Sequence, residues 1–289
     1  PASTVENVEI ITNPSAKYDP EGMSGIINIK LKENTNSALG LNGIANLNLG
    51  TPLPFVVPDG LPSIIPTAMA SLNLNYSTPK LNLFFNLDGG QRAHGRQSTS
   101  HIRRYSADTT TSEEDLEQLA QHINTMFSTK LGAEYHFTKQ TSLLLSYQLR
   151  LGNRRHLSEI NSNDLLNTND SLSYTQNDTN SNRNLNHIIN LSFIHKFNQP
   201  EQQFTFDATY SQRHGAGDGW QQQQYTLFPA ANWDNYYLRE TNSSSLNHNI
   251  NLQANYVHPF SEKLRLETGY EGRISSSDQD YDYFMSTYD

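Results

Sequence analysis

One pattern occurs four times along this chain: a strand of alternating polar and apolar residues, a short turn, and a second alternating strand. The four turns are centred near Pro79, Lys139, Pro200 and Ser261, which are 60, 61 and 61 residues apart. Between consecutive turns lie two strands joined by a long polar stretch. Short turns at one end and long loops at the other are typical of a transmembrane β-barrel. We therefore predict an all-β fold, an antiparallel transmembrane β-barrel with its short turns in the periplasm.

The strands themselves have the two-residue period that a membrane barrel requires. In 143–151, every odd position is apolar and the even positions are mostly polar. About ten residues of such alternation cross a bilayer, with one face in lipid and the other in a polar lumen. We expect lipid-facing positions at Leu145, Leu191 and Leu252, and lumen-facing positions at Gln148, Asn190 and Asn251.

Aromatic residues gather where the strands approach the short turns, at Tyr76, Tyr135, Phe137, Phe197, Phe204, Tyr256 and Phe260. An aromatic belt at a membrane interface would occupy these positions. The alternative is a soluble sandwich or propeller, whose half-buried strands also alternate. Propeller blades, however, repeat about every 40–50 residues, and long polar loops at one end only are foreign to them.

Composition agrees with a barrel, although it resembles that of a soluble chain. Only 35% of the residues are hydrophobic and the mean hydropathy is −0.67. A barrel explains both values, because only every second strand residue faces lipid. The absence of cysteine excludes disulfides and thiolate metal sites. A net charge of −9 argues against a nucleic-acid partner. No secretory signal is recognisable at the start, so any signal is expected outside this chain.

Nine strands are expected, at 38–50, 68–77, 81–92, 124–138, 141–153, 185–198, 203–213, 245–259 and 263–275. Single-chain bacterial barrels have an even number of strands, and open sheet edges are not tolerated in lipid. The segment Tyr281–Asp289 is expected to begin another long loop. We therefore expect the nine strands to form one part of a larger barrel.

The first residues differ in kind from the repeats. The text VENVEIITNPSAKYDPEGMSGIINIKLKEN contains two short strands, Val5–Ile11 and Ile26–Leu31, around a turn-rich connection. Over Val5–Lys32 it resembles the end of the plug domain of TonB-dependent outer-membrane receptors, in the variant found in Bacteroidetes. The resemblance implies two parts: the C-terminal end of a plug in 1–34, and the N-terminal part of a barrel with long extracellular loops in 35–289.

The same resemblance implies what lies around this chain. The norm in the family is a plugged barrel of 22 strands, with most of the plug and the energy-coupling segment upstream of Pro1. The implied partners are outer-membrane lipid, the TonB energy-coupling protein through a segment outside this chain, and a small-molecule or oligomeric substrate. A surface lipoprotein is a further candidate partner.

Four long loops are expected on the outside. The loop at 51–67 is proline-rich, and it either caps its own hairpin or packs on a partner. In 112–127, Ser112 and Asp115 form a capping pattern and apolar residues follow at helical spacing, so we expect a short surface helix. The loop at 159–184 is rich in Asn, Asp, Ser and Thr. We expect it to be mobile and solvated, and a cation site at its aspartates is the alternative.

The fourth loop is the candidate binding site. The segment 213–237 combines a glycine run with Trp220 and Trp233, the two tryptophans of the chain. Glycines let a loop reorient, and aromatic rings supply contact area at low entropic cost. We predict that His214, Trp220 and Trp233 bind substrate, with simple packing of loops as the alternative.

No catalytic motif, metal site or cofactor is expected. Four histidines, His94, His101, His214 and His248, are candidate haem or metal ligands. His94 and His214 lie at strand–loop junctions where a ligand role is conceivable, but His248 shares a face with Leu246 and Ile250. The segment HGAGDG is not followed by the GK[ST] of a phosphate loop. Two function classes remain: active import of a scarce iron complex, glycan or peptide through a plugged barrel, and a non-transporting surface barrel such as an adhesin or assembly subunit.

Overall fold

The computed structural model describes residues 5–11, 26–31, 39–50, 65–106, 109–166, 170–228, 236–261 and 264–288. Every element in these ranges is a β-strand. Within them, no helix of the length and apolarity needed to cross a membrane is present.

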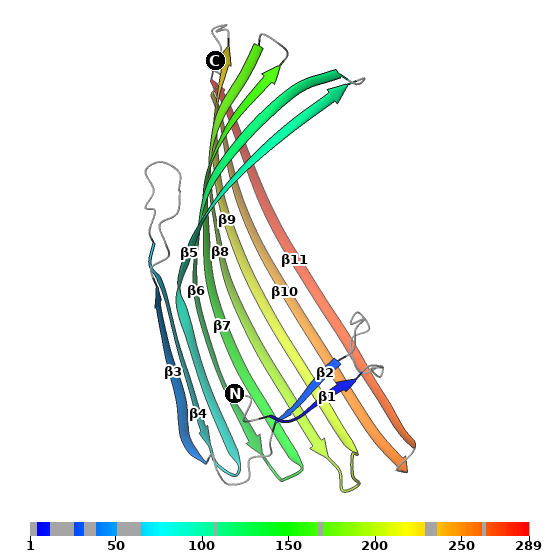
Figure 1. The fold of residues 1–289 in the computed structure, drawn as a ribbon. Coiled ribbons are helices and arrows are strands. Elements are labelled where there is room, and N and C mark those ends of the chain that lie inside the picture. The colour runs from blue at the N-terminus through cyan, green and yellow to red at the C-terminus, as the bar shows by residue number, and fades with distance from the viewer. Residues whose placement is uncertain are drawn as a thin grey trace.

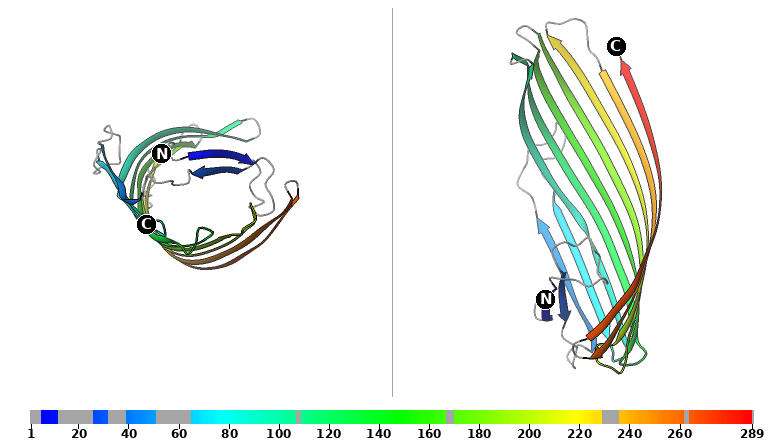
Figure 2. Two further views of the ribbon diagram at one scale, coloured as in Figure 1. Left: turned by 90° about the horizontal axis from the view of Figure 1, so that it is seen from below. Right: turned by 90° about the vertical axis from the view of Figure 1, so that its right-hand side faces the viewer.

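Nine strands form one antiparallel sheet, and each pairs with its neighbours along the chain (Figure 1). Their bounds are β3 Gly40–Gly50, β4 Thr67–Ser77, β5 Leu81–Ser106, β6 Thr109–His136, β7 Thr141–Leu166, β8 Asp170–Lys196, β9 Gln203–Phe228, β10 Tyr236–Ser261 and β11 Leu264–Tyr288. The sheet is curved into a wall with β3 and β11 at its edges (Figure 2). The predicted number of strands and their antiparallel arrangement are confirmed.

Tight turns close the β4–β5, β6–β7 and β8–β9 hairpins where the sequence predicts them. In the first, Thr78 N donates to Leu81 O at 2.7 Å, and Leu81 N donates to Thr78 Oγ1 at 2.9 Å. In the third, Glu201 adopts a left-handed φ of 65° and Gln202 N donates to Gln199 O at 3.2 Å. The short turns thus lie at one end of the sheet (Figure 1).

The strands β5 to β11 are much longer than predicted, at 25–28 residues each. The helix expected in 112–127 is wrong, because this segment is strand within β6 and pairs with β5 on one side and β7 on the other. Two bonded neighbours satisfy its backbone more completely than an isolated surface helix would.

The expected polar loops are also mostly strand. In 159–184, only 167–169 lie outside the described residues, and the rest continues β7 and β8. Polar side chains bond across these strands: Thr175 Oγ1 donates to Asn161 Oδ1 at 2.9 Å. The chain from Tyr281 to Tyr288 belongs to β11 and does not begin a loop. The loop at 51–67 lies almost entirely outside the described residues.

The two faces of the sheet differ as the alternation predicts. Directly opposed residues Leu145, Leu191, Ala208 and Leu252 form one row across β7 to β10. The adjacent row on the other face is polar and consists of Ser146, Asn190, Thr209 and Asn251. We call these the apolar and polar faces. The three leucines predicted to face lipid therefore lie on one face, and the three polar residues predicted to face the lumen lie on the other.

The apolar face becomes mixed well before the strands end. Its last continuous apolar row on β6, β7 and β8 consists of Phe127, Leu151 and Leu185, which are directly opposed. Further out, single apolar residues such as Ile123 and Leu157 alternate with polar and charged ones. Above this row the same face carries Asn153 and Arg155. About ten residues per strand therefore suit the hydrocarbon layer, and the outer halves of β5 to β11 extend the sheet beyond it.

Aromatic rings concentrate at the short-turn ends of the apolar face. Phe197 lies 6.0 Å from Tyr256, and Tyr135 lies 5.0 Å from Phe137, measured between ring centroids. Phe137 is 54% exposed and Phe260 is 60% exposed. Such exposure is expected of a belt at the lipid–water interface.

A separate two-stranded sheet precedes the wall. β1 (Val5–Ile11) and β2 (Ile26–Leu31) lie where the sequence predicts two short strands, and they pair in antiparallel fashion. The hairpin lies on the concave side of the large sheet (Figure 2).

Candidate functional site

The residues predicted to bind substrate lie on a strand. The proposed loop 213–237 is corrected to strand β9 as far as Phe228, with β10 beginning at Tyr236. His214 is opposed by Leu185 and Leu246, so it lies on the apolar face in the same row as Phe127 and Leu151. Trp220 lies on the same face, and Trp233 lies outside the described residues. Substrate binding by these three residues stays a prediction.

The glycines between them face the other way. Gly215, Gly217 and Gly219 lie on the polar face of β9. They are opposed by Asn184, Asn182 and Asn180 on β8 and by Ser245, Ser243 and Thr241 on β10. A Cβ added at Gly217 would lie 2.6 Å from Ser243 Oγ and 2.9 Å from Asn182 Oδ1. Because these glycines have no side chains, the carboxamides of β8 and the hydroxyls of β10 lean over them, and Ser243 Oγ donates to Gly217 O at 3.4 Å; we call this strip of the polar face the trough.

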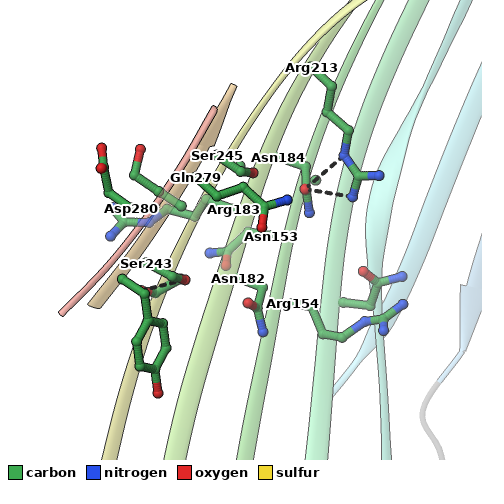
Figure 3. Close-up of a pocket in the computed structure, with 17 residues that line it drawn as sticks. Asn153, Arg154, Asn182, Arg183, Asn184, Arg213, Ser243, Ser245, Gln279 and Asp280 are labelled. Atoms are coloured by element: carbon green, nitrogen blue, oxygen red, sulfur yellow. Dashed lines mark hydrogen bonds between the residues drawn. The ribbon is translucent and has the colours of Figure 1, made fainter. Parts of the chain in front are cut away.

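This trough is part of a hollow of about 550 Å³. Its lining draws on six strands and includes Asn124, Arg154, Asn182, Arg213, Ser243 and Tyr281. Figure 3 shows Arg213 over Asn184, whose Oδ1 accepts bonds from Arg213 Nε at 3.3 Å and Nη2 at 2.9 Å. A pocket of this size can take a ligand as large as a typical drug.

The polar face around the hollow is strongly basic. Six arginines and two aspartates lie in five successive rows of opposed residues on this face. The first of these rows contains Asp88 and Arg150, and the last contains Arg96 and Asp178. The arginines are Arg92, Arg96, Arg150, Arg154, Arg213 and Arg239. Among the described residues, none of the six forms an ion pair within 4 Å. In a chain of net charge −9 this concentration creates a local field that attracts anions.

Three histidines are stacked on the polar face next to the hollow. His94, His122 and His156 are directly opposed on β5, β6 and β7. Their ring centroids are 4.8 Å and 4.4 Å apart. Burial lowers the pKa of His122, and the neighbouring His156 and His94 lower it further. Burial likewise lowers the pKa of His156, against the opposing effect of Asp178.

The histidines weighed as ligands have other surroundings. His94 belongs to the stack, and His101 lies 2.6 Å from Asp115. His248 Nδ1 lies 3.0 Å from the hydroxyl of Tyr210. Across the ranges that the structure describes, no group of three or more His, Asp or Glu side chains could hold a metal ion.

Sequence reasoning missed the hollow, because its residues come from strands far apart in the chain. One signal was present: glycines at 215, 217 and 219 and asparagines at 180, 182, 184 and 186 recur with period two. That period is the mark of a strand that presents one residue type to one face.

Residues 195–289 match the model of the outer membrane protein beta-barrel family. The match spans the end of β8 and all of β9, β10 and β11. It agrees with the all-β barrel fold and places the chain in the outer membrane. A search of curated proteins found no match.

Three solved structures can be aligned over nearly the whole chain. The ferric-catecholate import receptor Fiu from E. coli K12 is 10% identical, with 98% of this chain and 57% of Fiu covered and a TM-score of 0.24. The siderophore receptor PirA from Pseudomonas aeruginosa is 13% identical, with 99% of this chain and 74% of PirA covered and a TM-score of 0.22. The siderophore receptor PiuA from Acinetobacter baumannii is 9% identical, with 98% of this chain and 52% of PiuA covered and a TM-score of 0.22. The chain thus spans little more than half the length of Fiu and of PiuA.

Proposed function

We propose that this chain is part of an outer-membrane receptor that captures a scarce solute and imports it with energy from the inner-membrane TonB system. The observation that carries the proposal is the basic, polar hollow on the inner face of the wall, directly above the membrane-spanning rows. A surface that only anchored the protein would not need unpaired arginines facing the lumen.

The two parts of the chain have separate tasks in this proposal. Residues 1–34 end a plug, supported by their resemblance to receptor plugs and by the position of the β1–β2 hairpin on the concave side (Figure 2). Residues 35–289 form the first part of the barrel, which further strands would close at β3 and β11. Import requires binding and gating, so the proposal involves no covalent step and no enzymatic activity.

The proposed partners follow from these tasks. Lipid surrounds the apolar face, TonB pulls on the plug through a segment outside this chain, and a solute occupies the hollow. A surface lipoprotein that hands over the solute fits the tall outer halves of β5 to β11, which offer it a platform above the membrane.

A non-transporting surface barrel is the rival function, and those same outer halves favour it, since an adhesin also needs a platform. Uptake separates the two. Cells with and without the intact protein are given radiolabelled candidate solutes, in the presence and absence of a protonophore. Import predicts accumulation that requires both the protein and the proton gradient. Surface binding that a protonophore leaves unchanged, without accumulation of any solute, would favour the rival.

A further inference from the structure

We propose that the hollow binds an acidic oligosaccharide, with its carboxylate or sulfate groups on the arginines and its hydroxyls on the asparagine and serine side chains. This substrate class rests on the proposed import function and deepens it.

The charge of the ligand follows from the arginines. Arg154 is exposed at the hollow and has no hydrogen bond or ion pair with a described residue. Arg92 is on the same row, separated from Arg154 only by Asn124. Arg213 contacts a neutral carboxamide and not a carboxylate. Free guanidinium groups bind planar oxyanions through paired, charge-assisted hydrogen bonds.

The hydroxyl groups of the ligand follow from the trough. Asn182 and Asn184 on one side and Ser243 and Ser245 on the other offer both donors and acceptors along the glycine floor. Such groups suit a ligand that has hydroxyls along its whole length. A flat aromatic chelate would instead leave these polar groups without partners on binding, which costs affinity.

An exposed tyrosine beside the trough supports the same choice. Tyr281, opposed to Ser243, lines the hollow and is 66% exposed. Its hydroxyl can hydrogen-bond and its ring face can pack against a sugar. An exposed ring with a hydroxyl, beside many other hydrogen-bonding groups, matches a sugar better than it matches an apolar ligand.

Calorimetry on the intact receptor in detergent tests this assignment. The probes are tetragalacturonate, a heparin-derived tetrasaccharide, and neutral maltotetraose of the same length. At least one acidic probe should bind about tenfold or more tightly than maltotetraose, as expected for charge-assisted hydrogen bonds. Raising NaCl from about 50 mM to about 500 mM should weaken that binding, because the arginines are exposed to screening.

Variants locate the site. The double variant Arg154→Gln and Arg213→Gln should abolish the preference for the acidic probe. The matched control, Arg155→Gln and Arg103→Gln, removes the same charge from the opposite face and should bind as the unchanged receptor does. Heat-modifiable migration on gels checks that both are folded.

Two results would overturn the proposal: no acidic probe binding better than maltotetraose, or equal affinity in the two double variants. Neither depends on transport. If the acidic probe binds at this site but no energised uptake occurs, the proposed import function alone is refuted. If energised uptake occurs and the arginine substitutions do not change it, the ligand assignment alone is refuted.

Discussion

At the scale of single residues, the histidine stack makes the outer wall sensitive to acid. His94, His122 and His156 lie beyond the apolar rows, and both Arg96 and Arg154 face His122. The folded-state pKa values of His122 and His156 lie below the ordinary value of 6.5. Unfolded histidines therefore take up protons first as pH falls, so stability from the neutral stack is full above pH 6.5 and declines below it.

Hydrogen exchange at pH 7.5 and pH 5.5, corrected for the intrinsic rate, measures this effect. Amides in the outer halves of β5, β6 and β7 should lose protection at the lower pH. His122→Asn should reduce that loss, and His101→Asn, on the other face, should leave it as it is. Equal loss in both variants would show that other groups cause the acid response.

A second residue-scale prediction concerns the two faces within the membrane. Leu252 lies between Ala208 and Gly272 on the apolar face, near the middle of the membrane-spanning part of β10. Leu252→Arg in the intact protein should cost about 2–4 kcal/mol of unfolding free energy. Asn251→Arg should cost only about 1 kcal/mol, the value of the hydrogen bond that Arg273 Nε donates to Asn251 at 3.0 Å. Reversible denaturant titration in lipid vesicles compares them, and equal costs would contradict the facing.

At the scale of elements, sequence predicted the inner halves of the strands and missed the outer halves. Around Leu145 and Leu191, apolar and polar residues alternate, so the two-residue period can be seen in the sequence alone. In 173–184 both faces are polar, and alternation between asparagine and serine or threonine gives no hydrophobic contrast. In 112–127, apolar residues at helical spacing suggest a helix, but pairing on both sides decides the structure. The hollow needs the register of several strands, which no local pattern contains.

The length of the outer halves is itself testable by hydrogen exchange. Amides at 155–163 and 173–183 pair across β7 and β8 and have a further strand on each side. They should exchange orders of magnitude more slowly than free chain, because exchange requires the sheet to open. If these amides exchange at the rate of an unstructured peptide, the mobile loop predicted from the sequence at 159–184 is correct and the long strands are wrong.

At the scale of the whole molecule, the position of the turns sets the orientation in the membrane. Lys139 lies in the exposed β6–β7 turn, and Asn177 lies in the outer half of β8, far above the last apolar row. Short turns of bacterial barrels face the periplasm and the opposite ends face outward. Single cysteines can be placed at either position without competition, because the chain has no cysteine of its own. On whole cells, an impermeant thiol reagent should label Asn177→Cys and spare Lys139→Cys until the outer membrane is permeabilised. Labelling of Lys139→Cys alone would reverse the orientation, and the basic hollow would then open toward the periplasm, where it could not capture a solute arriving from outside.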